Sequence, residues 1–178
     1  MDEVIEPIPI YAQGYFHVHR SGLIDQIIIY DYWDPGRVYE SIIKDKKKLS
    51  EEINKLASNM QMFLDMEKVV INDKETHPIV VDVDIGLRGR PELAFIVFHI
   101  VFYGSLTPGV NKYVNIYEEE VVEYDYDVYW FFPEKTRVLK ADLGVPHRVS
   151  GDGRVLFFHV EKGTRINGRE TIIFKIES

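Results

Sequence analysis

Residues 122–132 read Val-Glu-Tyr-Asp-Tyr-Asp-Val-Tyr-Trp-Phe-Phe, and the alternation in this stretch decides the expected fold. In an extended strand, successive side chains point to opposite faces of the sheet. One face here carries apolar or aromatic side chains throughout: Tyr124, Tyr126, Val128, Trp130 and Phe132. The opposite face begins with the acidic residues Glu123, Asp125 and Asp127, and continues with Tyr129 and Phe131. A strand with one face buried in the core and the other exposed to solvent is typical of antiparallel sheets.

Similar short apolar runs, bounded by turn residues, follow one another along most of the chain. We expect strands at 8–20, 24–33, 69–71, 79–85, 93–102, 113–117, 137–143, 155–160, 164–166 and 169–176. Asn72-Asp73 is typical of a turn, and Asn167-Gly168 of a two-residue hairpin loop. The pattern predicts a mainly β (α+β) protein, an antiparallel β-sandwich or a jelly-roll-like barrel, with residues 1–178 in a single domain.

One amphipathic helix is expected at residues 50–67. Ser50 is a suitable N-cap, and Glu51 and Glu52 lie in the first turn, where the helix dipole favours acidic groups. Apolar residues recur at a spacing of three and four and form one stripe: Ile53, Leu56, Ala57, Met60, Phe63 and Leu64. We expect this stripe to pack on the sheet.

The segment between the second expected strand and this helix has two interpretations. Asp34-Pro35-Gly36 suits a tight turn, after which residues 37–43 return as a strand. Alternatively, Asp34 caps a helix that begins at Pro35. The hairpin is the interpretation that we favour.

The composition argues against several classes of partner and of chemistry. The net charge is −8 and the only basic run, Lys44 to Lys48, is interrupted by Asp45, so we expect no nucleic-acid partner. The absence of cysteine removes disulfides, thiolate metal sites and cysteine nucleophiles, and fits a cytoplasmic or a thermophilic protein. The longest apolar stretch, Leu93 to Tyr103, is shorter than the roughly 20 residues that span a bilayer, so no transmembrane segment is expected. Cytoplasm is the expected location, or an extracytoplasmic one if the chain is part of a longer protein.

Three histidines form the candidate metal site. His17 and His19 share one strand face, so both imidazoles can approach one ion. The stretch 144–149, Gly-Val-Pro-His-Arg-Val, resembles the second signature of the cupins, and His17-Val18-His19 is similar to the HxH of that family. The resemblance implies a jelly-roll enzyme that binds one divalent transition metal through His17, His19 and His147. The chain departs from the family in the position of the acidic residue, Asp25, and in the helix between the two motifs.

Two acidic groups are further candidates for ligand or ion binding. Asp82 and Asp84 share a strand face, and paired carboxylates can hold a hard cation. The alternative is the solvated face of a strand whose Val81, Val83 and Ile85 point inward. Glu119 and Glu120 belong to an acidic cluster that can bind an ion or a basic partner, or protect a sheet edge.

The chain contains no GxSxG, P-loop, dinucleotide-binding or HExxH motif. We therefore favour a non-enzymatic binding or structural module that contacts a protein or a glycan and needs no cofactor. The cupin-like metal enzyme is the main alternative. Two further alternatives are a small-ligand binder with a cavity between helix 50–67 and the sheet, and a homo-oligomer formed by edge pairing.

Overall fold

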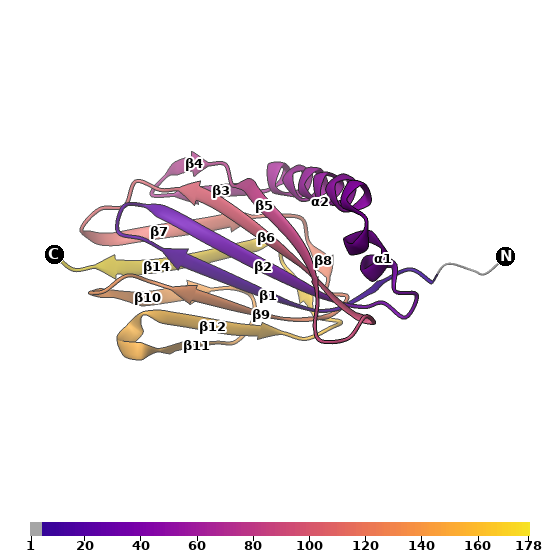
Figure 1. The fold of residues 1–178 in the computed structure, drawn as a ribbon. Coiled ribbons are helices and arrows are strands. Elements are labelled where there is room, and N and C mark those ends of the chain that lie inside the picture. The colour runs from indigo at the N-terminus through magenta and orange to yellow at the C-terminus, as the bar shows by residue number, and fades with distance from the viewer. Residues whose placement is uncertain (1–4) are drawn as a thin grey trace.

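A computed structural model describes residues 5–178 as two β-sheets packed face to face, with two helices at one end (Figure 1). The larger sheet has seven strands in the order β11-β12-β9-β1-β2-β6-β5. In that order the strands span His147–Ser150, Val155–Val160, Asp125–Phe131, Ile8–Val18, Leu23–Trp33, Leu93–Tyr103 and Ile79–Leu87. The central strands β1 and β9 pair in parallel, whereas the other ladders of this sheet are antiparallel.

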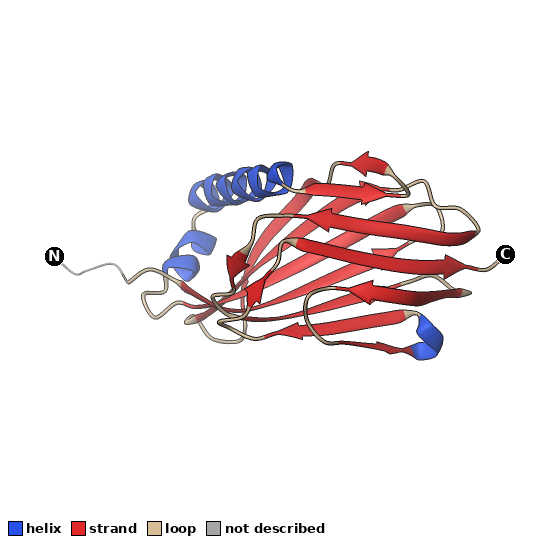
Figure 2. Ribbon diagram, turned by 180° about the vertical axis from the view of Figure 1, so that it is seen from behind, coloured by secondary structure: helices blue, strands red, loops and turns tan. Residues whose placement is uncertain are grey.

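The smaller sheet has five antiparallel strands in the order β10-β14-β7-β3-β4 and lies in front in Figure 2. Its strands span Thr136–Asp142, Arg169–Ile176, Gly109–Ile116, Lys68–Ile71 and Lys74–Thr76. A separate two-stranded ladder joins β8 (Glu120–Val121) to β13 (Arg165–Ile166), and a 3₁₀ turn, η1, covers Gly151–Gly153. The predicted mainly β sandwich is confirmed, whereas a closed jelly-roll-like barrel is absent from residues 5–178.

Strand β6 shows how the sequence separates the two faces of the larger sheet. Its buried side chains alternate without interruption: Ala94, Ile96, Phe98, Ile100 and Phe102. Toward one end of the sheet this inner face packs on the smaller sheet, in a core that includes Trp130 and Ile172. Toward the other end it packs under the helices, in a second core that includes Tyr39 and Leu64. Burial of these side chains is the main source of stability, because each contributes roughly 1.5–3 kcal/mol.

The helices α1 (Val38–Lys44) and α2 (Lys46–Met66) lie over the inner face near β5 and β6. The predicted amphipathic helix at 50–67 is confirmed but begins earlier, because Asp45 and not Ser50 accepts hydrogen bonds from the first turn. The Gln61 side chain fastens α2 to β5: its amide donates to the Pro78 carbonyl (3.1 Å) and accepts from the Val80 N–H (2.9 Å). None of the helices in residues 5–178 is both long and apolar enough to cross a bilayer.

Two turns differ from the prediction. The favoured hairpin at residues 37–43 is wrong, because the buried Asp34 carboxylate accepts hydrogen bonds from the Val38 and Tyr39 N–H groups and starts α1. The predicted hairpin at Asn167-Gly168 is also wrong. There β13 pairs with β8, while β14 continues into the smaller sheet, so the turn passes the chain between sheets.

Gly22, in the turn between β1 and β2, is a position where the fold requires glycine. Its φ is +92°, and a Cβ there would lie 2.0 Å from the Gly104 carbonyl oxygen. Gly89 has a similar φ of +74° but nothing within 4 Å of its missing Cβ. The two positions therefore form a matched pair that separates backbone strain from a steric clash.

We predict that Gly22→Ala lowers the free energy of unfolding by about 3 kcal/mol or more, since strain and clash add. Gly89→Ala should cost only about 1 kcal/mol, the strain alone. Urea denaturation followed by circular dichroism measures both. Equal losses for the two variants would contradict the packing of the β1–β2 turn against Gly104.

Candidate functional site

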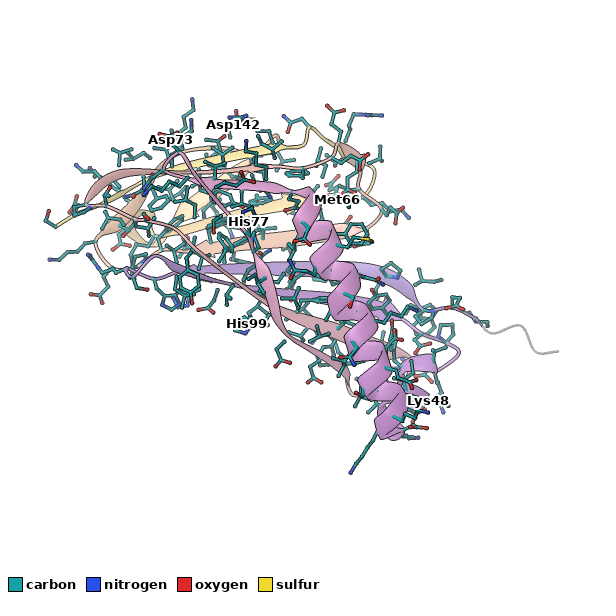
Figure 3. The ribbon with its side chains drawn as sticks, turned by 90° about the horizontal axis from the view of Figure 1, so that it is seen from above. Lys48, Met66, Asp73, His77, His99 and Asp142 are labelled. Carbon is teal, nitrogen blue, oxygen red and sulfur yellow. The ribbon has the colours of Figure 1, made fainter. Side chains whose placement is uncertain are left out.

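The face of the seven-stranded sheet that points away from the smaller sheet and the helices is the first candidate site, and we call it the outer face. It is formed by alternate residues of the central strands: Tyr11, Gln13, Tyr15 and His17 of β1; Asp25, Ile27, Ile29 and Asp31 of β2; Phe95, Val97, His99 and Val101 of β6; Asp125, Asp127, Tyr129 and Phe131 of β9; Phe157 and His159 of β12. Most of these side chains are half-buried by their neighbours in the sheet. Figure 3 shows His99 on the side of the sheet away from the smaller sheet.

Aromatic rings pack against one another across the outer face. Tyr15 and Tyr129 are partners in the β1–β9 ladder, and their ring planes are parallel within 9° at a centroid distance of 5.5 Å. Tyr129 also contacts Phe131 (6.0 Å) and Phe157 (4.8 Å). The Arg148 guanidinium lies 4.6 Å from the Phe157 ring centre. The result is a continuous aromatic strip over three strands, with a cation at its border.

A carboxylate between two imidazoles occupies one end of this face. Asp25 Oδ2 lies 2.7 Å from His19 Nε2, and Asp25 Oδ1 lies 2.8 Å from His99 Nε2. The hydrogen bond to His99, and then that to His19, holds the pKa of the Asp25 carboxyl below its ordinary range. The His17 ring lies 4.5 Å from the His19 ring. Each imidazole uses its own carboxylate oxygen, so both oxygens of Asp25 have a hydrogen-bond partner.

Two other carboxylates of the outer face, Asp127 and Asp31, also accept hydrogen bonds from side chains. Asp127 accepts hydrogen bonds from the Tyr11 hydroxyl and from His159 Nδ1 (2.6 Å). The bond to Asp127 raises the pKa of His159. Asp31 accepts from Arg88 Nε (2.6 Å). Asp25, Asp31 and Asp127 therefore all accept hydrogen bonds from side chains of the protein itself.

The structure does not bring the three predicted metal ligands together. His147 pairs with Phe158 of β12, which pairs with Val128 of β9 and, through it, with Gly14 of β1. His147 is therefore three strand intervals, about 14 Å, from β1. Paired residues share a face, so His147 points to the inner side, whereas His17 points to the outer side. Within residues 5–178 no group of three potential ligands is arranged to hold a metal ion.

Asp82 and Asp84 lie on β5, the edge strand of the larger sheet, and they do not converge on a common point. Asp82 Oδ1 accepts from the Val83 N–H and Asp84 Oδ1 from the Ile85 N–H, both at 2.9 Å. These side chains occupy backbone donors of an open sheet edge, where an unpaired N–H could recruit a foreign strand. Val81, which was expected to point inward, is exposed because the ladder shifts register beside it.

Glu119 and Glu120 point to different places. Glu119 is exposed and lies 4.0 Å from Arg165. Glu120 lines the second candidate site, a cavity of about 240 Å³ between the inner face of the larger sheet and β14. The other lining residues come from five strands and the loop before β9: Ala12, Gln13, Gly14, Phe16, Gln26, Ile28, Tyr30, Tyr124, Tyr126, Val128, Phe158 and Glu170.

Glu170 is the most perturbed acid in the described part of the chain. Burial, and then the negative charge of Glu67, raise its pKa to about 7, while a hydrogen bond with Tyr117 acts in the opposite direction. Burial also raises the pKa of Glu67 and Glu120. Perturbed acids that line a cavity mark a functional-site candidate.

Most residues of these sites were not among the predicted site residues, and two of them, Glu170 and His99, carry a sequence signal. Glu170 lies two residues before Ile172 in a strand whose even-numbered positions, Ile172, Phe174 and Ile176, are all buried, so alternation alone places a carboxyl inside. His99 alternates with the apolar outer-face positions of β6. Asp25 follows His19 at a distance that only the hairpin pairing explains.

The comparisons with known proteins do not identify a function, so the functional argument depends on these residues. No family model matches the sequence, and no curated protein matches it. The chain is similar to the folded domain of LppM from Mycobacterium tuberculosis, with a TM-score of 0.45 and 7% identity over 100% of this chain and 96% of that one. It is also similar to an aminopeptidase N family protein from Idiomarina loihiensis, with a TM-score of 0.38 and 7% identity over 91% of this chain and 29% of that one.

The raised pKa of Glu170 predicts a pH-dependent stability. The folded state keeps the Glu170 proton between pH 4.5 and about pH 7, whereas the unfolded state has lost it, so this contribution falls as the pH rises through that window. Glu170→Gln should remove this pH dependence. From pH 5 to pH 8 the parent should lose about 2 kcal/mol of folding stability that the variant keeps, so the variant should be the more stable protein at pH 8. Thermal unfolding at several pH values measures the effect.

Glu119→Gln is the matched control, because it removes an exposed carboxyl from the neighbouring surface. It should leave the pH profile unchanged. A Glu170→Gln profile parallel to that of the parent would contradict the burial of an ionisable Glu170.

Proposed function

We propose that this protein is a non-enzymatic binding module that docks a partner protein on its outer face. The observation that carries the proposal is the combination of width and chemistry on this face. Seven strands give six intervals and a width of about 29 Å, and strands of 11 residues give a length of about 36 Å. An interface of standard size needs about 800 Å² per partner, which this face can supply.

The chemistry of the outer face favours a protein over a glycan. Its carboxylates Asp25, Asp31 and Asp127 already accept hydrogen bonds from side chains of the protein. Aromatic and aliphatic side chains, among them Tyr129, Phe131 and Phe157, lie between these carboxylates. Aromatic residues are enriched at protein interfaces, where they bury much area at little entropic cost. The partner surface expected here is apolar and uncharged.

The alternative of a cupin-like enzyme finds no support in the geometry. His17 and His147 occupy opposite faces of the sheet, an arrangement that does not support a shared ion. His19 is engaged by Asp25 instead. The binding hypothesis needs no such convergence, since it relies on the outer face as a whole.

Site-specific cross-linking in the cells that make the protein tests the proposal. We predict that a photo-reactive phenylalanine analogue at Tyr15 or Phe131 links to the same partner protein. The analogue at Leu139, an exposed apolar residue of β10 in the smaller sheet, should not. Mass spectrometry of the adduct identifies the partner, and binding is then measured with the two purified proteins.

Matched substitutions complete the test. Phe131→Lys should weaken binding of the purified partner about tenfold or more, because a charge is buried in the interface. Leu139→Lys should change it less than twofold. Both variants should unfold at the temperature of the parent. An adduct with a second copy of this chain, adducts from Leu139 as readily as from Phe131, or no adduct would each overturn the proposal.

A further inference from the structure

The cavity between the sheets combines acidic and phenolic groups with an apolar floor. Two carboxyls, Glu120 of β8 and Glu170 of β14, face it from the side of the smaller sheet. Three phenols, those of Tyr30, Tyr124 and Tyr126, line it from the larger sheet and the loop before β9. No lysine, arginine or histidine lines it in the described part of the chain.

Gly14 of β1 forms part of the floor of the cavity. Gly14 lies opposite Val128 in the β1–β9 ladder. A Cβ at Gly14 would lie in ordinary van der Waals contact with the Val128 methyl groups, at 3.7 and 3.9 Å, so the site has room for an added group here. Ile28 and Phe158 extend the apolar surface to either side. Glu120 is exposed, which places the mouth of the cavity at β8.

We propose that this cavity binds a small organic cation, an amine or methylated ammonium with an apolar body, with a total size of about eight non-hydrogen atoms. The size follows from the cavity volume of about 240 Å³ and the roughly 30 Å³ that one water molecule occupies in the liquid. The apolar body lies on the floor formed by Gly14, Val128 and Phe158. The cationic group lies among the phenol rings and the two carboxyls.

The wall chemistry selects an organic cation over a metal ion. A metal needs several oxygen or nitrogen ligands at one point, and residues 5–178 contain no such group of three acidic or histidine side chains. Here burial, and then the charges of Glu170 and Glu120, raise the pKa of the Tyr126 phenol, so an aromatic ring lies near both carboxyls. Aromatic rings with a nearby negative charge are the usual environment of alkylammonium groups in proteins. An anion is disfavoured, since every ionisable group that lines the cavity is acidic or phenolic.

The protonation of Glu170 is coupled to binding. The pKa of this carboxyl, about 7, leaves about one tenth of the molecules ionised at pH 6 and about nine tenths at pH 8. Ionisable groups from several elements interact electrostatically with Glu170. They are Glu67, which follows α2; Tyr113 of β7; Tyr117, which follows β7; and Tyr126 of β9. None of them is a cation. A bound ammonium group therefore supplies the missing positive charge, and its binding releases a proton.

Two compounds of equal size test the proposal with the whole protein. Phenethylammonium carries the charge, and 2-phenylethanol is its neutral counterpart. We predict that phenethylammonium binds with chemical-shift changes centred on Gly14 and Val128, and that its affinity rises up to about tenfold from pH 6 to pH 8. The affinity for 2-phenylethanol should be weaker and independent of pH. Calorimetry in buffers of different ionisation enthalpy should detect the released proton at pH 7.

Three variants separate charge from shape. Glu170→Gln should weaken phenethylammonium binding about tenfold or more and leave 2-phenylethanol binding unchanged. Glu119→Gln, on the adjacent surface, should alter neither. Gly14→Leu should fill the cavity and abolish binding of both compounds, while circular dichroism shows the parent fold. Equal affinities for the two compounds, shift changes outside the cavity, or no binding at millimolar concentration would each overturn the proposal.

Discussion

The strict alternation of side chains along the central strands of the larger sheet is the constraint on which the other features depend. In β6 every second residue is buried from Ala94 to Phe102, and the registers of β1, β2 and β9 keep the same side inward. A shift of one residue in any of these ladders would exchange the two faces. The sheet therefore has one face that holds the protein together and one face available for contact.

The acidic side chains on the two faces of the larger sheet lie in different surroundings. On the outer face Asp25, Asp31 and Asp127 accept hydrogen bonds from neighbouring side chains, which lowers the cost of covering them with a partner. On the inner side, Glu170 faces a cavity with no cation nearby, and its proton is held because the charged form is poorly solvated. The outer face is thus suited to a neutral partner, and the cavity to a positively charged ligand.

Much of the fold could be predicted from the sequence, because its signals are local. Period-two alternation located most strands, and the three- and four-residue spacing located α2. The errors arose where a distant contact decides the local structure. Residues 37–43 fit a strand or a helix equally well until Asp34 is buried beside α1, and Asn167-Gly168 fits a hairpin until β8 pairs with β13. The histidines illustrate the same limit. His17 and His19 share a face by alternation, but the position of His147 depends on strand order, which no local pattern contains.

Single-cysteine scanning of β6 tests the sidedness of the larger sheet most directly, since the natural chain contains no cysteine. Cysteine would replace each residue from Phe95 to Ile100 in turn, and its reaction rate with a water-soluble thiol reagent would be measured in the native state. The account predicts fast reaction at 95, 97 and 99 and strong protection at 96, 98 and 100. Uniform rates, or protection at the odd-numbered positions, would contradict it.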